Sequence, residues 1–195
     1  RLSATPESRT ESARLLEELD AILPGELSVV GNAASLLEAR HGTLIDQRPT
    51  LRFNKAQVID AGAQGERWDF VATSNGPVLR YYQEHEPAYH HLLFTPYLDG
   101  HKAALARIGS RRPVLTMPLR LSRELSWRCR ARPTTGMQVL RLLDRLGRQV
   151  HLFGFDWKAT PTFYDPTRTK DPHNHARERR LALEMIERNG WRVYR

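Results

Sequence analysis

The hydrophobic residues of the chain switch repeatedly between helical spacing and strand spacing. Near the N-terminus, Leu15, Leu16, Leu19, Ile22 and Leu23 follow helical spacing, and Pro24-Gly25 ends the run. Short β-rich runs follow at 27–32, 50–54 and 67–73, with a helical pattern between the first two at 35–39. This alternation is typical of an α/β fold.

The second half of the chain continues the pattern. It predicts strands at 78–82, 92–95 and 113–117 and a helix at 101–108. A helix opening at Thr134-Thr135-Gly136 places Met137, Leu140, Leu143 and Leu146 on one face and closes at Gly147. A strand at 149–154, a helix at 176–188 and a strand at 191–194 complete the set. Tyr81, Tyr82 and Trp127 are expected to be core or wall residues. We therefore predict an N-terminal helix or leader at 1–25 and one Rossmann-like domain at 26–195, with a mostly parallel sheet flanked by helices.

Composition excludes several classes of protein. The 195 residues suffice for one full domain, and 40% hydrophobic with 27% charged residues is an ordinary globular balance. No apolar run approaches the ~18 residues of a membrane span, and residues 1–10 lack the apolar core of a signal peptide. Cys129 is the single cysteine, which excludes an internal disulfide and indicates a reducing compartment. We expect a cytoplasmic protein, either free or at the inner face of the membrane; an anchor removed upstream is compatible with both.

The net charge of +8 is unevenly distributed. Residues 1–46 hold four arginines against eight carboxylates, whereas residues 105–148 hold eleven arginines against Glu124 and Asp144. Such a basic stretch attracts an anionic substrate, an acidic acceptor glycan or an anionic membrane face. A solvated basic face explains it equally well, since 26 of the 30 basic residues are Arg, as in a GC-rich genome. No zinc-finger spacing, RNP-like strand or leucine zipper is present, so nucleic acid is not an expected partner.

Three short motifs fall where a doubly wound sheet binds ligands, at the carboxyl ends of strands and at helix N-termini. Gly31, Asn32 and Ser35 lie at a strand-to-helix junction, where Gly31 allows close approach and Ser35 can cap the helix. Asn54 ends the 50–54 strand, and Thr134-Thr135-Gly136 begins a helix. An ordinary turn, a polar loop and a capped amphipathic helix explain the same residues. The first motif is not GxGxxG, which disfavours a nicotinamide cofactor.

Histidines gather before the last predicted helix. His173 and His175 precede Glu178, and a histidine at this point can act as a general base near neutral pH. Residues two apart do not share a helix face, so the pair is a poor zinc site, and we predict no metal ion. Solvated histidines beside a helix cap are the alternative interpretation.

In this order and spacing, the motifs resemble those of the sialyltransferases of glycosyltransferase family 29. Residues 29–75, with Val-Val-Gly-Asn-Ala-Ala-Ser-Leu, Ile45-Asp46, Leu51–Ala56, Gly65 and Arg67, are similar to the large sialylmotif. Residues 132–137 and 150–155 are similar to the small sialylmotif. Thr162-Phe163-Tyr164-Asp165 resembles the third motif, and His173 with Glu178 matches the last, His-x4-Glu. The four blocks cover nearly half the chain.

Two departures from the family pattern stand out. Thr162 occupies the position at which the third motif usually has His, and Cys129 has no partner for the bridge of the animal enzymes. The chain is also shorter than the animal catalytic domains. The missing bridge and the lack of a visible anchor are typical of a bacterial member.

The resemblance implies an inverting transfer of sialic acid from a CMP-activated donor to a hydroxyl of an acceptor glycan or glycolipid. Gly31, Asn32 and Ser35 would line the phosphate and ribose, Asn54 would hold the nucleotide, and Thr134, Thr135 and Gly136 would contact ribose and cytosine. His173 would be the catalytic base, with His175, Glu178 and Thr162 as secondary candidates. Our own addition is that Tyr164 donates to the departing phosphate in place of the absent histidine.

No cofactor is expected beyond the CMP-sugar itself. The sequence has no Asp-x-Asp, the usual metal-diphosphate signature of other sugar transferases, and a monophosphate leaving group can be stabilised by helix amides and hydroxyls. Two alternatives stay open. A CMP-Kdo-dependent transferase of bacterial surface glycans has the same nucleotide motifs, and a catalytically dead nucleotide-binding module would agree with the short chain and with Thr162.

Overall fold

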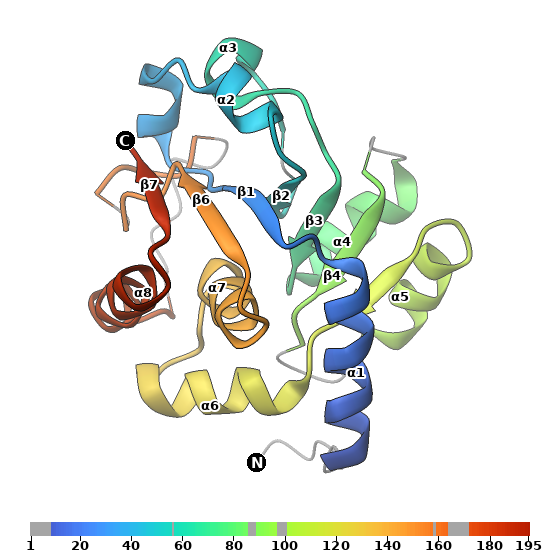
Figure 1. Ribbon diagram of the computed structural model, residues 1–195. Helices are drawn as coiled ribbons and strands as arrows, with labels where there is room; N and C mark the ends of the chain where they lie inside the picture. The colour runs from blue at the N-terminus through green and yellow to red at the C-terminus, as the bar shows by residue number, and fades with distance from the viewer. Residues whose placement is uncertain (1–8, 56, 86–88, 97–100, 158, 164–171) are drawn as a thin grey trace.

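A computed structural model describes residues 9–55, 57–85, 89–96, 101–157, 159–163 and 172–195. Within them, seven parallel strands form one sheet in the order β5-β4-β3-β2-β1-β6-β7 (Figure 1). The strands are β1 (Glu26–Val30), β2 (Thr50–Phe53), β3 (Phe70–Thr73), β4 (His91–Phe94), β5 (Val114–Thr116), β6 (Gln149–Phe153) and β7 (Arg192–Tyr194). The predicted α/β class and Rossmann-like architecture are confirmed.

Helices cover both faces of the sheet. They are α1 (Arg9–Ile22), the 3-10 helix η1 (Ala34–Glu38), α2 (Gly42–Asp46), α3 (Ala61–Gln64), α4 (Gly76–Glu84), α5 (Lys102–Gly109), α6 (Leu119–Cys129), α7 (Thr135–Arg145) and α8 (His175–Asn189). The alternation of side chains along each strand divides the core. In β1, Leu27 and Val29 join the main cluster with α1, α6, α7 and α8, whereas Val30 packs with η1 and α2 on the other face.

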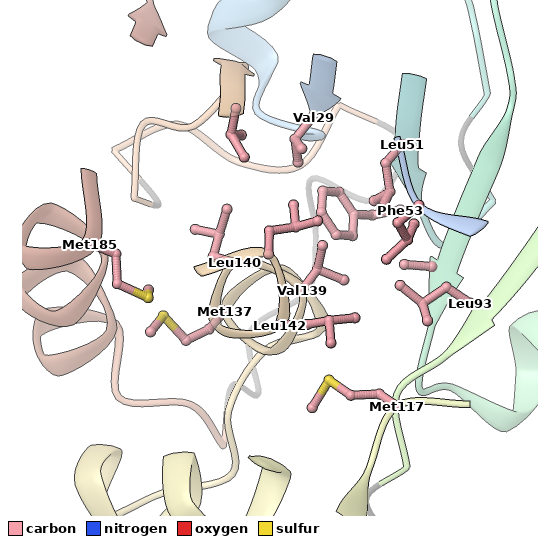
Figure 2. Packing of buried hydrophobic residues seen from close by; sticks show 14 of the residues in the cluster. Val29, Leu51, Phe53, Leu93, Met117, Met137, Val139, Leu140, Leu142 and Met185 are labelled. Atoms are coloured by element: carbon pink, nitrogen blue, oxygen red, sulfur yellow. The ribbon is translucent and has the colours of Figure 1, made fainter. Parts of the chain in front are cut away.

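Helix α7 is the centre of the main core. Leu140 and Val139 contact the layer that holds Val29, Leu51 and Phe53 of the sheet, and Met185 of α8 lies at its side (Figure 2). On the side away from the sheet, the buried Gln138 of α7 accepts a 2.7 Å hydrogen bond from Ser122 of α6. Helix α7 is thus packed between the sheet, α6 and α8, which holds its N-terminus in a defined place.

The structure contradicts two sequence predictions. Residues 78–82 are not a strand but part of α4, in which Val78, Leu79 and Tyr82 are buried at helical spacing and Pro77 occupies the first turn. Trp127 is not a core or wall residue, because its position on the outward face of α6 leaves 81% of it exposed. Helices α2, α3 and α6 were not predicted, and the predicted helix at 35–39 is the single 3-10 turn η1.

Candidate functional site

The order of the strands marks one edge of the sheet as the binding edge. The chain adds β2 to β5 on one side of β1 and then returns to add β6 and β7 on the other side. The carboxyl ends of β1 and β6 therefore form the topological switch point, where open α/β sheets bind ligands. A cavity of about 510 Å³ lies at this edge, lined by residues that follow β1, β2, β3 and β6 and by the first residues of α4, α7 and α8.

Gly31 and Gly154 come into backbone contact at the switch point. The N–H of Gly31 donates to the carbonyl of Phe153 over 2.7 Å. A Cβ on Gly31 would lie 2.3 Å from the carbonyl oxygen of Gly154, which itself has φ +66°. The close approach of these two backbone segments therefore explains a glycine at position 31 without a ligand. Both glycines also line the cavity.

Asn32 and Asn54 present amide groups at the ends of adjacent strands. The Nδ2 of Asn32 donates to the backbone carbonyl of Phe53 over 3.2 Å. The backbone carbonyl of Asn32 accepts from the N–H of Phe163. Asn54 adopts φ +55°, a left-handed conformation that Asn tolerates, and its Oδ1 accepts from Thr73 over 3.3 Å. Both asparagines line the cavity, in fixed orientations.

The N-terminus of α7 opens into the cavity through Thr134, Thr135 and Gly136. The hydroxyl of Thr134 accepts from the N–H of Met137 and donates to Glu178, so it is committed to the helix cap. The N–H groups of Thr135 and Gly136 belong to the first turn, where a helix supplies no acceptor of its own. These amides, with the positive end of the helix dipole, suit an anion.

A second helix N-terminus lines the same cavity, that of α4, through Asn75, Gly76 and Pro77. Ser74 hydrogen-bonds Thr135 over 2.9 Å between hydroxyl oxygens, which links the approach to α4 with the start of α7. His101 also lines the cavity and lies against Gly76, where a Cβ would meet its ring at 2.8 Å. These residues were missed because 78–82 was assigned to a strand; Pro77 at the start of the hydrophobic run was the available signal.

His173 lines the cavity immediately before Asn174, the residue that caps α8. Its Nδ1 lies 2.7 Å from the carbonyl oxygen of Arg132. Because a carbonyl only accepts, Nδ1 carries the proton, and in the neutral ring Nε2 is the basic nitrogen. The ring of His175 lies 5.9 Å away, centroid to centroid, and also lines the cavity.

Glu178, in the first turn of α8, connects that helix with α7. The buried carboxylate accepts the N–H of Thr134 over 2.8 Å and the Thr134 hydroxyl over 2.7 Å. Burial raises the pKa of Glu178 above its ordinary value, against the opposing effects of the Thr134 donors and the nearby histidines. The contact joins the first turn of α8 to the N-cap of α7, so Glu178 positions both sides of the site.

One expected site residue, Ser35, does not belong to the cavity lining. The hydroxyl of Ser35 donates to Asp156 over 3.2 Å, and Ser35 neither caps η1 nor belongs to the cavity lining. Thr162 lines the cavity and forms an antiparallel bridge with Ala33. Tyr164 lies outside the described residues.

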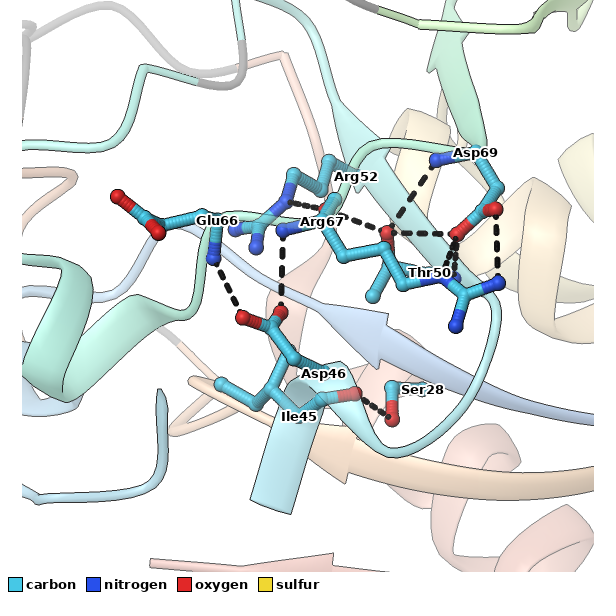
Figure 3. A network of polar contacts seen from close by, with 8 residues as sticks. All are labelled: Ser28, Ile45, Asp46, Thr50, Arg52, Glu66, Arg67 and Asp69. Atoms are coloured by element: carbon cyan, nitrogen blue, oxygen red, sulfur yellow. Dashed lines mark hydrogen bonds and ion pairs between the residues drawn. The ribbon is translucent and has the colours of Figure 1, made fainter. Parts of the chain in front are cut away.

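Other residues of the large motif belong to a separate polar network beneath β2 (Figure 3). The buried Arg52 donates to the carbonyls of Arg67 and Gln64, over 2.9 and 2.8 Å, and burial lowers its pKa to about 10. Asp46 accepts the backbone N–H groups of Glu66 and Arg67. These contacts hold the segment between β2 and β3 in place, so this half of the motif supports the fold.

In the described part of the chain, no group of three or more His, Cys, Asp or Glu residues is placed to hold a metal ion. None of the helices described is long and apolar enough to cross a membrane.

Comparison with known structures adds to this geometry. The fold is similar to a crystal structure of a mammalian sialyltransferase, with a TM-score of 0.66 and 17% identity over 98% of this chain and 80% of that one. It is also similar to a mammalian sialyltransferase in complex with Gal-beta-1-3GalNAc-ortho-nitrophenol, with a TM-score of 0.62 and 16% identity over 98% of this chain and 81% of that one. No family model and no curated protein matches the sequence. At this identity the likeness extends to the fold: a seven-stranded parallel sheet in the arrangement of a sialyltransferase.

Proposed function

We propose that the protein is an inverting glycosyltransferase that moves a ulosonic acid from its CMP-activated form to a hydroxyl of an acceptor glycan. One observation carries the proposal. The cavity at the switch point combines two helix N-termini, suited to a phosphate, with a histidine whose basic nitrogen is defined by its backbone contact. The likeness of the fold to sialyltransferases and the sequence motifs support the same reaction.

The roles of the residues follow from their positions. Nε2 of His173 takes the proton of the acceptor hydroxyl, whose oxygen attacks the anomeric carbon. The bond from that carbon to the phosphate oxygen breaks, and CMP leaves with the electron pair. Attack from the opposite face inverts the configuration. The amides of Thr135 and Gly136 stabilise the charge that develops on the phosphate, in place of the ribose and cytosine contacts that the resemblance implies for them. Asn32 and Asn54, fixed by neighbouring strands, hold the nucleotide.

A donor screen tests the proposal. The protein is incubated with CMP-sialic acid or CMP-Kdo and a galactose-containing acceptor such as the disaccharide bound in the similar structure. We expect CMP release that depends on acceptor, with product from CMP-sialic acid. Product from CMP-Kdo alone would favour the Kdo transferase. CMP binding without turnover of either donor would identify a dead binding module.

An EDTA arm of the same assay tests the metal requirement. We expect full turnover in EDTA, because helix amides and hydroxyls stabilise a monophosphate leaving group. Loss of turnover in EDTA and its recovery with magnesium or manganese would show that this assignment is wrong.

A further inference from the structure

The outward face of α6 has a composition that neither the core nor the proposed reaction explains. Leu121, Leu125 and Cys129 are buried against the main core. Arg120, Arg123 and Trp127, at positions i, i+3 and i+7, share the opposite, exposed face. In Figure 1, α6 forms an outer layer of the molecule, beyond α7 and away from the sheet.

Trp127 is 81% exposed, whereas Trp191 is buried and Trp68 and Trp157 are half-buried. A folded tryptophan normally buries 150–250 Å². Among the described residues, the other exposed large hydrophobics are Ile59 and Leu183, so no broad apolar patch surrounds Trp127. An isolated exposed indole is a feature of membrane interfaces, where one part of the ring meets lipid and its N–H meets water.

The charge around Trp127 is positive. Arg120, Arg123 and Arg130 are exposed on α6 and at its end. Arg128 and Arg180 share one carboxylate, Glu184, at 3.4 and 3.8 Å. Glu124, the single carboxylate of α6, pairs with Arg141 at 2.9 Å. Residues 119–130 hold four arginines against this one carboxylate, and such an excess of positive charge attracts an anionic partner.

We propose that the outward face of α6, defined by Arg120, Arg123, Trp127 and Arg130, docks on an anionic lipid bilayer. Trp127 inserts at the level of the head groups and the arginines contact lipid phosphates. Charge complementarity favours this occupant. A stable protein partner would need about 800 Å² on each side with an apolar centre, and a single indole does not supply that centre.

A short stretch of chain links this face to the cavity. Helix α6 ends at Cys129, three residues before Arg132, whose carbonyl holds His173, and five before Thr134 at the cavity. If the proposed function holds, the acceptor is then a glycolipid in that membrane. The docking itself does not depend on the transfer reaction.

Co-sedimentation with vesicles tests the docking. The probes are vesicles of phosphatidylcholine alone and vesicles with a third of phosphatidylglycerol. We expect binding only to the second kind, weakened by 0.5 M salt. Trp127→Ala should weaken it about tenfold. Arg120→Glu with Arg123→Glu should weaken it more than 25-fold, since each arginine near the surface contributes about fivefold.

Two matched controls lie on another part of the molecule. Ile59→Ala removes an exposed apolar side chain, and Arg40→Glu reverses an exposed charge; both should leave binding unchanged. The tryptophan emission should shift to shorter wavelength on anionic vesicles, and Trp127→Phe should abolish the shift. Equal binding to neutral vesicles, no binding, or equal losses in the controls would overturn the proposal. Self-association in lipid-free buffer that Trp127→Ala abolishes would assign this face to a second copy and overturn it too.

Discussion

The imidazole of His173 is oriented by the 2.7 Å contact between its Nδ1 and the carbonyl oxygen of Arg132. A backbone acceptor cannot be removed by changing the Arg132 side chain, so the tautomer is defined by the fold. His173→Ala should therefore lower turnover by about 10²–10⁴-fold and leave CMP affinity nearly unchanged, because a general base acts in the transition state. Steady-state kinetics with CMP titration measures both. His175→Ala is the control and should lose less; near-wild-type turnover of His173→Ala would contradict the assignment.

Gly31 and Gly136 both line the cavity, but they are glycines for different reasons. Gly31→Ala would place a Cβ 2.3 Å from a backbone oxygen, so we expect it to destabilise the fold by about 1–3 kcal/mol. In Gly136→Ala the Cβ meets nothing closer than 3.6 Å within the protein. This variant should be as stable as the wild type or more so, since Ala favours a helix by up to about 1 kcal/mol. It should nevertheless bind CMP more weakly, because Gly136 lines the cavity and the added methyl group takes space beside the bound nucleotide. Urea unfolding and CMP titration separate the two effects, and unchanged affinity in Gly136→Ala would place the nucleotide elsewhere.

At the scale of elements, the contact between Thr134 and Glu178 ties α7 to α8. Thr134→Val removes the hydroxyl that both caps α7 and donates to Glu178, and Glu178→Gln removes the charge that accepts it. Because one hydroxyl serves both interactions, the two changes should be non-additive by about 1–2 kcal/mol in urea unfolding. Thr134→Ser, which keeps the hydroxyl, should lose far less than Thr134→Val. Strict additivity would show that the helices are joined by other contacts.

The same carboxylate makes stability depend on pH. Burial raises the pKa of Glu178 above 4.5 in the folded protein, so the folded state holds this proton more tightly than the unfolded state. Its contribution is complete below pH 4.5 and is lost as pH rises through the elevated folded pKa. The free energy of unfolding of the wild type, relative to Glu178→Gln, should therefore fall as pH rises from 4.5 toward neutral. Urea titrations of both proteins at several pH values measure the difference, and a rise would contradict the sign.

Elements whose hydrophobic residues recur with clear strand or helical spacing were predictable. Elements in which that spacing is mixed with other residue preferences were not. The strands from β1 to β3 and the amphipathic α7 follow clear patterns and were found. Helix α4 was mistaken for a strand because Tyr81-Tyr82 and Val78 have high β propensity, while packing against α5 and β4 decided the outcome. In helix α6, the buried Leu121, Leu125 and Cys129 follow i, i+4, i+8 spacing. The arginines and the exposed Trp127 between them made this helical pattern hard to recognise.

At the scale of the whole molecule, the sequence predicts which edge of the sheet binds a ligand, but only some of the residues that line the cavity there. Gly31 and Asn54 lie at the ends of predicted strands and Thr134 begins a predicted helix, and the parallel sheet brings those ends together. His101 and the residues around Gly76 were not assigned to the site, because residues 78–82 were assigned to a strand although Pro77 signals a helix start. The local sequence predicts that Ser35 binds a ligand. In the structure its hydroxyl instead donates a hydrogen bond to Asp156, which is distant in sequence.

The cavity joins β1, β2, β3 and β6 with α4, α7 and α8, so a ligand bound there should stabilise the entire domain. If CMP binds only the folded state, a concentration of 100 times its dissociation constant should add about 2.7 kcal/mol to the free energy of unfolding. For a domain of this size, that corresponds to a rise in Tm of roughly 5–10 °C. Differential scanning fluorimetry with CMP measures the rise. Inorganic phosphate at the same concentration is the control for general anion binding and should give a much smaller shift, because it lacks the groups that Asn32 and Asn54 would contact. An equal shift with phosphate would mean that the helix N-termini bind any anion, and no shift with CMP would contradict a nucleotide site in this cavity.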